Sequence, residues 1–190
     1  MRASKLFFAW FVWTGICGLV AFSQSRAPVR NPARRAAGAV SPSLQPQVMA
    51  NLLQLMRGTL FPASNVIFAA QSQDPAKVPP ARDPALATDP LANSYGGWQA
   101  VENAALAIGD TANLLIIPGR KCSNGIDVPL KNPDWAKFVQ GLRDAALTTY
   151  KAAQSKDQDK ITDAAGTLSE ACANCHDKYR EKKGLTDRCK

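Results

Sequence analysis

The sequence predicts an all-α fold, and within that class an antiparallel four-helix bundle. Four segments carry apolar residues at spacings of three and four, which is the periodicity of one face of a helix. No segment shows the alternation of a strand, and no internal repeat is detectable. Four amphipathic helices without strands are most simply packed as a bundle around one core. The 190 residues suffice for one such domain with additional segments.

The N-terminal part of the chain is predicted to lie outside this bundle. Residues 1–26 join a short basic start to a mostly apolar run, as a secretory signal peptide does, although the run is also long enough for an uncleaved anchor. Residues 27–42 are rich in Ala, Arg, Ser and Pro and predict a flexible tether. The helical domain is therefore assigned to residues 43–190, in a chain exported to the periplasm. Membrane association is expected only if the N-terminal segment is retained as an anchor.

The charge of the chain excludes one class of partner. Its formal net charge is +8 at pH 7, but the sequence contains no dense Lys/Arg tract with interleaved aromatic residues, so nucleic-acid binding is not expected. A moderately basic surface suits an acidic partner protein or an anionic membrane face, and it is also the ordinary exterior of a solvated domain.

The first helix is predicted to begin near Ser43. Its apolar face carries Met49, Leu52, Leu53, Met56 and Leu60. Pro62 should end or kink this helix, after which two more turns are expected. Five prolines between Gln73 and Gly97 then predict a long connection.

Three further helices follow. The second carries the stripe Trp98, Val101, Ala105, Ile108, Ala112 and Leu115, and Pro118-Gly119 should stop it. The third should start with Asn132 as cap and Pro133 as first residue, and carries Trp135, Phe138, Leu142, Ala145 and Thr149. The fourth carries Ile161, Ala164, Ala165, Leu168, Cys172, Cys175 and Tyr179, with its end predicted near Gly184.

The fourth helix contains the motif that carries the chemistry, Cys172-Ala-Asn-Cys175-His176. Two thiols at this spacing can each add to a vinyl group of one porphyrin, and the adjacent imidazole can bind the iron. Half a zinc site would need a second Cys or His pair, and a thioredoxin-like pair would need a βαβ context; neither is present, and His176 is the only histidine. The motif therefore predicts one covalently attached haem c, inserted between the helices.

The run C-A-N-C-H-D-K-Y-R near the C-terminus of an exported all-α chain resembles the class II c-type cytochromes, the cytochrome c′ family. The resemblance extends roughly over residues 43–183 and implies His176 as proximal iron ligand. It also implies Arg180 as a basic residue near a haem propionate, the alternative being a solvated surface arginine. In this family a Met from the first helix accompanies six-coordinate electron carriers, and an apolar residue there accompanies five-coordinate proteins that bind NO or CO.

The sixth iron ligand is left open by the sequence. The Pro-rich first connection and the segment L-M-R-G-T-L-F-P-A-S-N depart from the family pattern. With one histidine, the position is taken by Met, Lys, Tyr or water, or is empty. Apart from Met1, only Met49 and Met56 are available, and both are also explained as core fillers. Met56 is favoured because a helix distortion before Pro62 could aim it at the iron.

The expected function is single-electron transfer, without enzymatic activity, to a redox partner protein that the sequence does not identify. The alternative is a five-coordinate gas-binding protein. A peroxidase is disfavoured because no distal histidine is available for acid–base chemistry. A homodimer is left open.

Two cysteines remain once the leader and the haem motif are set aside, Cys122 and Cys189. Each follows a helix, the second and the fourth, and these two run in the same direction in an up-down-up-down bundle. Their ends should meet at one pole in an oxidising compartment, which predicts a Cys122–Cys189 disulfide. The alternative is a pair of free or intermolecular thiols.

Overall fold

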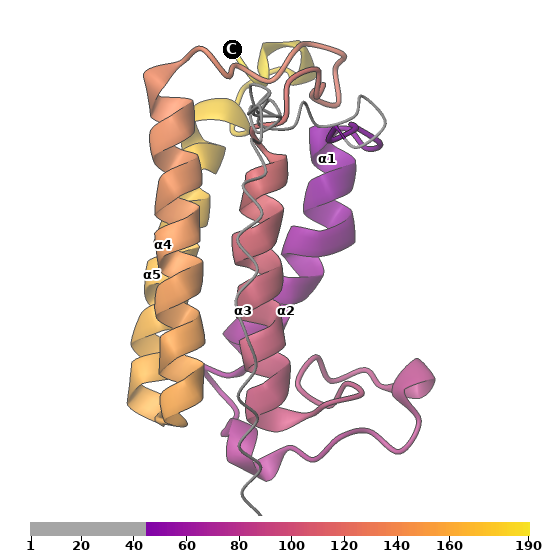
Figure 1. Cartoon of the computed structure of the whole chain (residues 1–190), viewed down its shortest axis with the longest axis vertical. Coiled ribbons are helices and arrows are strands. Elements are labelled where there is room, and N and C mark those ends of the chain that lie inside the picture. The colour runs from indigo at the N-terminus through magenta and orange to yellow at the C-terminus, as the bar shows by residue number, and fades with distance from the viewer. Residues whose placement is uncertain (1–44) are drawn as a thin grey trace, which may run out of the picture. The chain divides into compact units, whose positions relative to one another are not determined.

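The computed structural model describes residues 45–190, and the regular elements in this range are helical. Four helical segments lie side by side (Figure 1). The first is composite, with α1 (Leu52–Leu55), η2 (Met56–Leu60) and α2 (Phe61–Ala69), and it is followed by α3 (Gly97–Leu114), α4 (Pro133–Ser155) and α5 (Gln158–Tyr179). The all-α prediction is confirmed for these residues. The predicted signal peptide and tether lie outside them.

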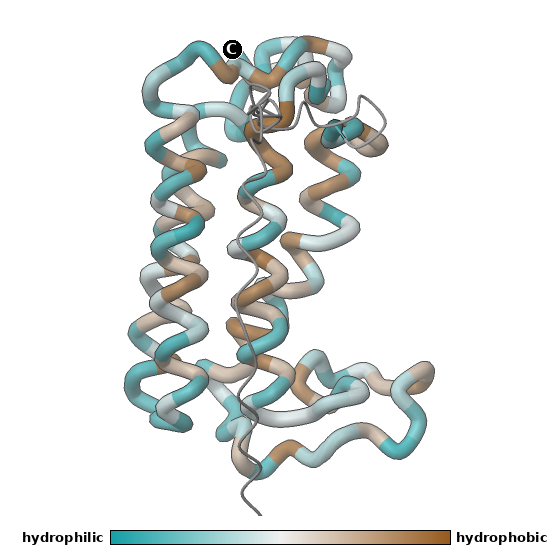
Figure 2. Tube along the Cα trace, in the orientation of Figure 1, coloured by the Kyte–Doolittle hydropathy of each residue, from teal (hydrophilic) through white to brown (hydrophobic). Residues whose placement is uncertain are grey.

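The core is formed by the apolar stripes of the helices. Contacts join α2 to α3, α3 to α4, α4 to α5, and α2 to α5. Figure 2 shows hydrophobic positions recurring along each of these helices between hydrophilic ones. The largest fully buried side chains are Trp135, Ile67, Leu91, Ile108, Ile161, Leu168 and Val101. Among the described helices, none combines the length and the hydropathy that a membrane crossing requires.

The first helix begins later than the sequence predicted. Asn51 accepts a hydrogen bond from the Gln54 N–H at 2.9 Å, and the Gln54 side chain accepts one from the Asn51 N–H at 2.9 Å. This reciprocal pair is a capping box, which fixes the helix start at Leu52. Met49 therefore precedes the helix and is 89% exposed. The prediction that Met49 lies on the apolar face of this helix is wrong.

The middle of the first helix is distorted at Met56–Leu60, which form a π-helical turn. The Phe61 N–H donates to the Met56 carbonyl, five residues back. Pro62 follows in the first turn of α2, where its missing N–H is tolerated. The helix is therefore widened rather than ended by the proline, and it continues to Ala69.

The long Pro-rich connection contains two short 3₁₀ turns, η3 (Pro75–Lys77) and η4 (Pro84–Leu86). It lies at the end of the helices opposite the C-terminus (Figure 1). Its last turn depends on Gly96, whose φ of 74° places the position of a β-carbon 2.4 Å from the Pro80 nitrogen. A side chain at this position would clash with the backbone.

The stripes predicted for α3, α4 and α5 are buried or partly buried, as expected. Two details of the helix ends differ. Asn132 is the N-cap of α4, but its side chain donates to the Tyr179 hydroxyl instead of capping the helix. Helix α5 ends at Tyr179 rather than near Gly184, because the chain turns back and the Cys189 N–H donates to the Tyr179 carbonyl at 2.9 Å.

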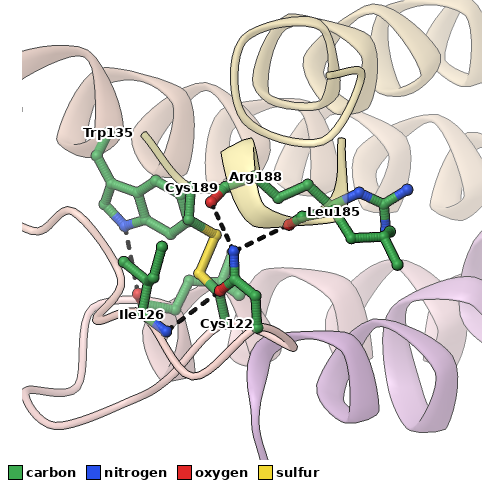
Figure 3. The surroundings of a disulfide bond; sticks show 8 residues. Cys122, Ile126, Trp135, Leu185, Arg188 and Cys189 are labelled. Atoms are coloured by element: carbon green, nitrogen blue, oxygen red, sulfur yellow. Dashed lines mark hydrogen bonds between the residues drawn. A yellow bond between two sulfur atoms is a disulfide. The ribbon is translucent and has the colours of Figure 1, made fainter. Parts of the chain in front are cut away.

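The returning tail, residues 180–190, is fixed to the loop of residues 115–132. The predicted Cys122–Cys189 disulfide is present, with a Cα–Cα distance of 6.6 Å (Figure 3). The side-chain nitrogen of Asn124 donates to the carbonyls of Leu185 and Arg188 at 3.0 and 3.1 Å. One covalent and two polar contacts therefore hold the tail across this end of the molecule.

The same loop is joined to the start of the first helix. The Leu52 N–H donates to the Lys121 carbonyl at 2.8 Å. Arg120 is 3% exposed, and its guanidinium donates to the carbonyls of Leu114 and Ala50. Burial lowers the pKa of Arg120 from its ordinary value, and the two carbonyls compensate part of that desolvation. These contacts place the loop between the first helix and the tail.

Candidate haem site

A pocket lies where the first helix begins and α5 ends. It holds about 520 Å³ of space between the atoms, a figure that includes open solvent at its mouth. Most of its wall is apolar. The lining comes from the first helix (Leu52, Leu53, Met56), the loop (Cys122, Ser123), α4 (Trp135), α5 and its end (Cys175, His176, Tyr179, Arg180), and the tail (Arg188, Cys189).

Most of the residues singled out in the sequence meet at this pocket. Met56, Cys175, His176 and Arg180 all line it, although Met56 comes from the other end of the domain sequence. Cys172 is half-buried one turn earlier on α5 and packs against the core beside the pocket. Their roles in binding haem stay predictions, and this pocket is where the haem would be bound.

Helical spacing explains why α5 presents its motif to one side. Residues three and four apart lie on the same face of a helix, so Cys172, Cys175, His176 and Tyr179 follow one another along it. Both thiols are free, and both pack partly against the core. The face that carries the motif is therefore the one directed at the first helix and α4.

The two thiols are held in the protonated form. Burial raises the pKa of Cys175 to about 11, with further contributions from Cys172 and the Asp134 carboxylate. Burial also raises the pKa of Cys172. A disulfide-exchanging or metal-binding cysteine needs an easily formed thiolate, so this pair is unlike a thioredoxin-type site. Within residues 45–190, no group of three or more His, Cys, Asp or Glu side chains is placed to hold a metal ion.

The surroundings of His176 favour its neutral form. It is half-buried, and burial together with the nearby Arg180 cation lowers its pKa, against smaller opposing effects of Glu181 and Asp177. A lowered pKa keeps the imidazole neutral near pH 7. A neutral ring nitrogen has the lone pair that an iron ligand requires.

A polar network fixes the pocket wall behind the motif. The Tyr179 hydroxyl donates to Asp134 at 2.6 Å, and Asn132 donates to the same hydroxyl at 3.3 Å. Asp134 also pairs with Lys178. The rings of Tyr179 and Trp135 meet edge to face, with centroids 5.1 Å apart. The network joins the start of α4 to the end of α5. The Tyr179 hydroxyl is already hydrogen-bonded in this network, which argues against Tyr179 as an iron ligand.

Replacing Asp134 by Asn should lower stability in a pH-dependent way. Hydrogen bonds from Lys178 and Tyr179 hold the pKa of Asp134 below its usual range. Because the folded-state pKa is the lower one, the stabilisation is present above the ordinary value of about 3.9 and is lost as pH falls through the folded-state value. The free energy of unfolding of Asp134→Asn should be lower than that of the wild type near neutral pH. The gap should close in acid.

Urea unfolding across a pH series measures this gap. Asp110→Asn, at an exposed aspartate of α3, is the matched control and should show no such profile. A gap between Asp134→Asn and the wild type that stays constant from neutral pH into acid would contradict the role of the Asp134 carboxylate.

Several residues in the pocket wall or directly behind it were not predicted from the sequence. Asp134 and Tyr179 are 45 residues apart, and no local pattern connects them. Arg188 lies in a short polar tail without periodicity. Cys122 and Cys189 were predicted as a pair, but not as part of the pocket wall. Only the folded arrangement assigns these residues to the site.

The lining suits a largely apolar group with acidic edges. Its walls are apolar, its histidine is neutral, and the Nε of Arg188 is buried there without a hydrogen-bond partner. These are the properties that a haem with its carboxylate side chains would need.

Comparison with known proteins gives one match. The cytochrome c′ family model matches residues 131–180, which contain α4, α5 and the Cys-x-x-Cys-His motif. Neither a curated protein nor a solved structure matches the chain significantly. The match agrees with the helical fold and with the composition of the pocket, and it shows that residues 131–180, the last two helices, are similar to the cytochrome c′ family.

Proposed function

We propose that this chain is an exported cytochrome that transfers single electrons through one haem c. Cys172 and Cys175 would attach the group, and His176 and Met56 would bind its iron. The domain would then be an antiparallel four-helix bundle closed around the haem. The observation that carries the proposal is that Met56 and His176, from different helices, line the same pocket.

The haem supplies the one-electron couple in such a site. The two thiols of α5 would hold it on the helix that also carries His176. The neutral imidazole would offer a nitrogen to the iron, and the apolar walls would exclude water. A redox partner protein would approach through the open mouth of the pocket. No acid–base residue is needed for this chemistry, and we propose no enzymatic activity.

Met56 favours electron transfer over gas binding. It starts the π-helical turn of the first helix, and turns of this kind are frequent at functional sites. Met56 and His176 would supply two ligands to the iron, and Met/His ligation raises the reduction potential of haem, which suits an electron carrier. Cytochrome c′ proteins are typically periplasmic, and we place this one there, where the leader predicted for residues 1–26 would direct it.

Replacing Met56 by Leu should convert the haem to a form that is open to external ligands. The volume is nearly conserved, so the fold should be retained while the thioether is lost. The weak near-infrared band of the oxidised wild type, which reports sulfur bound to iron, should disappear completely. The reduced variant should bind CO rapidly.

Absorption spectra of the oxidised and reduced proteins, with and without CO, measure these changes. Met49→Leu is the matched control, because Met49 is exposed and precedes the helix. It should leave both spectra unchanged. A wild type that is high-spin and binds CO rapidly would overturn the electron-transfer proposal and establish the five-coordinate gas-binding alternative.

A further inference from the structure

Two arginines line the pocket, and they differ in what they contact. The Arg180 guanidinium pairs with the carboxylate of its neighbour Glu181. The Arg188 side chain makes no hydrogen bond or ion pair with any residue in the range 45–190, and its Nε is buried. Arg188 as a whole is half-buried, but a buried N–H donor without an acceptor is unfavourable and requires an explanation. Among the two arginines of the pocket, Arg188 is therefore the one that has no acceptor within residues 45–190.

The pocket wall offers no carboxylate to Arg188. None of the twelve lining residues is Asp or Glu. An occupant of the pocket would supply an acceptor, and guanidinium groups match planar carboxylates with two parallel hydrogen bonds. We propose that Arg188 binds a propionate carboxylate of the haem. This inference rests on the proposed function.

The position of Arg188 is set by the contacts on both sides of it. Its carbonyl accepts from Asn124 at 3.1 Å, and the next residue, Cys189, is bonded to Cys122 (Figure 3). The Cys189 N–H also donates to the Tyr179 carbonyl at 2.9 Å. The disulfide thus holds a cation at the wall of the pocket. Arg188 lies beyond the segment that matches the family model, so this contact belongs to the chain's own tail.

The sign of the effect follows from charge. Oxidised haem carries one more positive charge than reduced haem. Arg188 neutralises a carboxylate of the same group, and its removal leaves that negative charge free to favour the oxidised form. Arg188→Gln should therefore lower the reduction potential. At a fixed ambient potential we expect the ratio of reduced to oxidised protein to fall roughly fivefold.

The experiment is a redox titration of the purified, haem-loaded full chain, followed by absorption. It compares the wild type with Arg188→Gln, Arg188→Lys, Arg180→Gln and Lys190→Gln. Lys190 is the matched control, because it is an exposed cation of the same tail and pairs with Asp187 outside the pocket. Arg188→Gln should lower the potential, Arg188→Lys should restore most of it, and Lys190→Gln should leave it unchanged.

Three results would overturn the inference: equal shifts in Arg188→Gln and Lys190→Gln, no shift in Arg188→Gln, or a shift in Arg180→Gln alone. If Arg188→Gln yields no folded protein, the infrared difference spectrum between oxidised and reduced Arg188→Lys replaces it. The carboxylate band of the propionate should lie at a different frequency in Arg188→Lys than in the wild type. A band at the same frequency in both proteins would reject the contact. Covalent haem in the wild type is verified first by staining, so a failure here is separate from a failure of the proposed function.

Discussion

Replacing both Cys172 and Cys175 by Ala should abolish haem attachment completely. Each thiol is expected to form one thioether to the porphyrin, and without sulfur neither bond can form. Both side chains are partly buried and pack against the core, so alanine removes the chemistry without adding a polar group there. The double variant should show no haem stain after denaturing, non-reducing electrophoresis. The wild type should keep its stain.

The matched control removes the other two cysteines. Cys122→Ala with Cys189→Ala deletes the same number of sulfur atoms but leaves the haem motif intact, so its stain should persist. The single variants Cys172→Ala and Cys175→Ala should each retain at most one thioether. Stain that survives in the Cys172 and Cys175 double variant, or that is lost from the denatured wild type, would contradict covalent attachment at this motif.

The helices were predictable where an apolar period is sustained. The stripe from Trp98 to Leu115 keeps its spacing over the length of α3, and its residues are buried. The first helix shows where the pattern fails, because apolar periodicity continues through Met49 although Asn51 and Gln54 form a capping box. Periodicity alone does not mark where a helix starts, whereas this polar pair does. A local polar contact decided the helix start.

The site was only partly predictable, for a different physical reason. Cys172, Cys175 and His176 are contiguous, so their shared chemistry appears as a motif. The Tyr179 contact to Asp134 and the placement of Arg188 arise from tertiary packing and leave no periodic trace. Cys122 and Cys189 were paired by elimination and by helix direction, which are long-range arguments that a bundle makes available. Contacts that depend on where a loop or tail packs against the helices can be assigned only from the structure.

Removal of the Cys122–Cys189 disulfide should lower the free energy of unfolding more than either Asp134→Asn or Asn124→Ala. The bond joins residues 67 positions apart, and the chain-entropy model assigns about 4 kcal/mol to a closed loop of this length. Both cysteines are buried, so the Cys122→Ala, Cys189→Ala protein avoids the additional penalty of a buried hydroxyl. Its free energy of unfolding should fall by about that amount. Urea unfolding of the haem-loaded protein, followed by circular dichroism, measures it.

The tail contacts provide a graded comparison for this variant. Asn124→Ala removes two hydrogen bonds to the carbonyls of Leu185 and Arg188 but keeps the disulfide, so we expect a loss of only about 1–2 kcal/mol. Because the disulfide acts mainly on the unfolded chain, the cysteine variant should also expose more surface on unfolding and show a larger urea dependence. Asn124→Ala should not change that slope.

Peptide mapping without reduction must first recover Cys122 and Cys189 as one linked peptide. Two separately alkylated peptides, or an unchanged unfolding midpoint in the cysteine variant, would contradict the stabilising role of the disulfide.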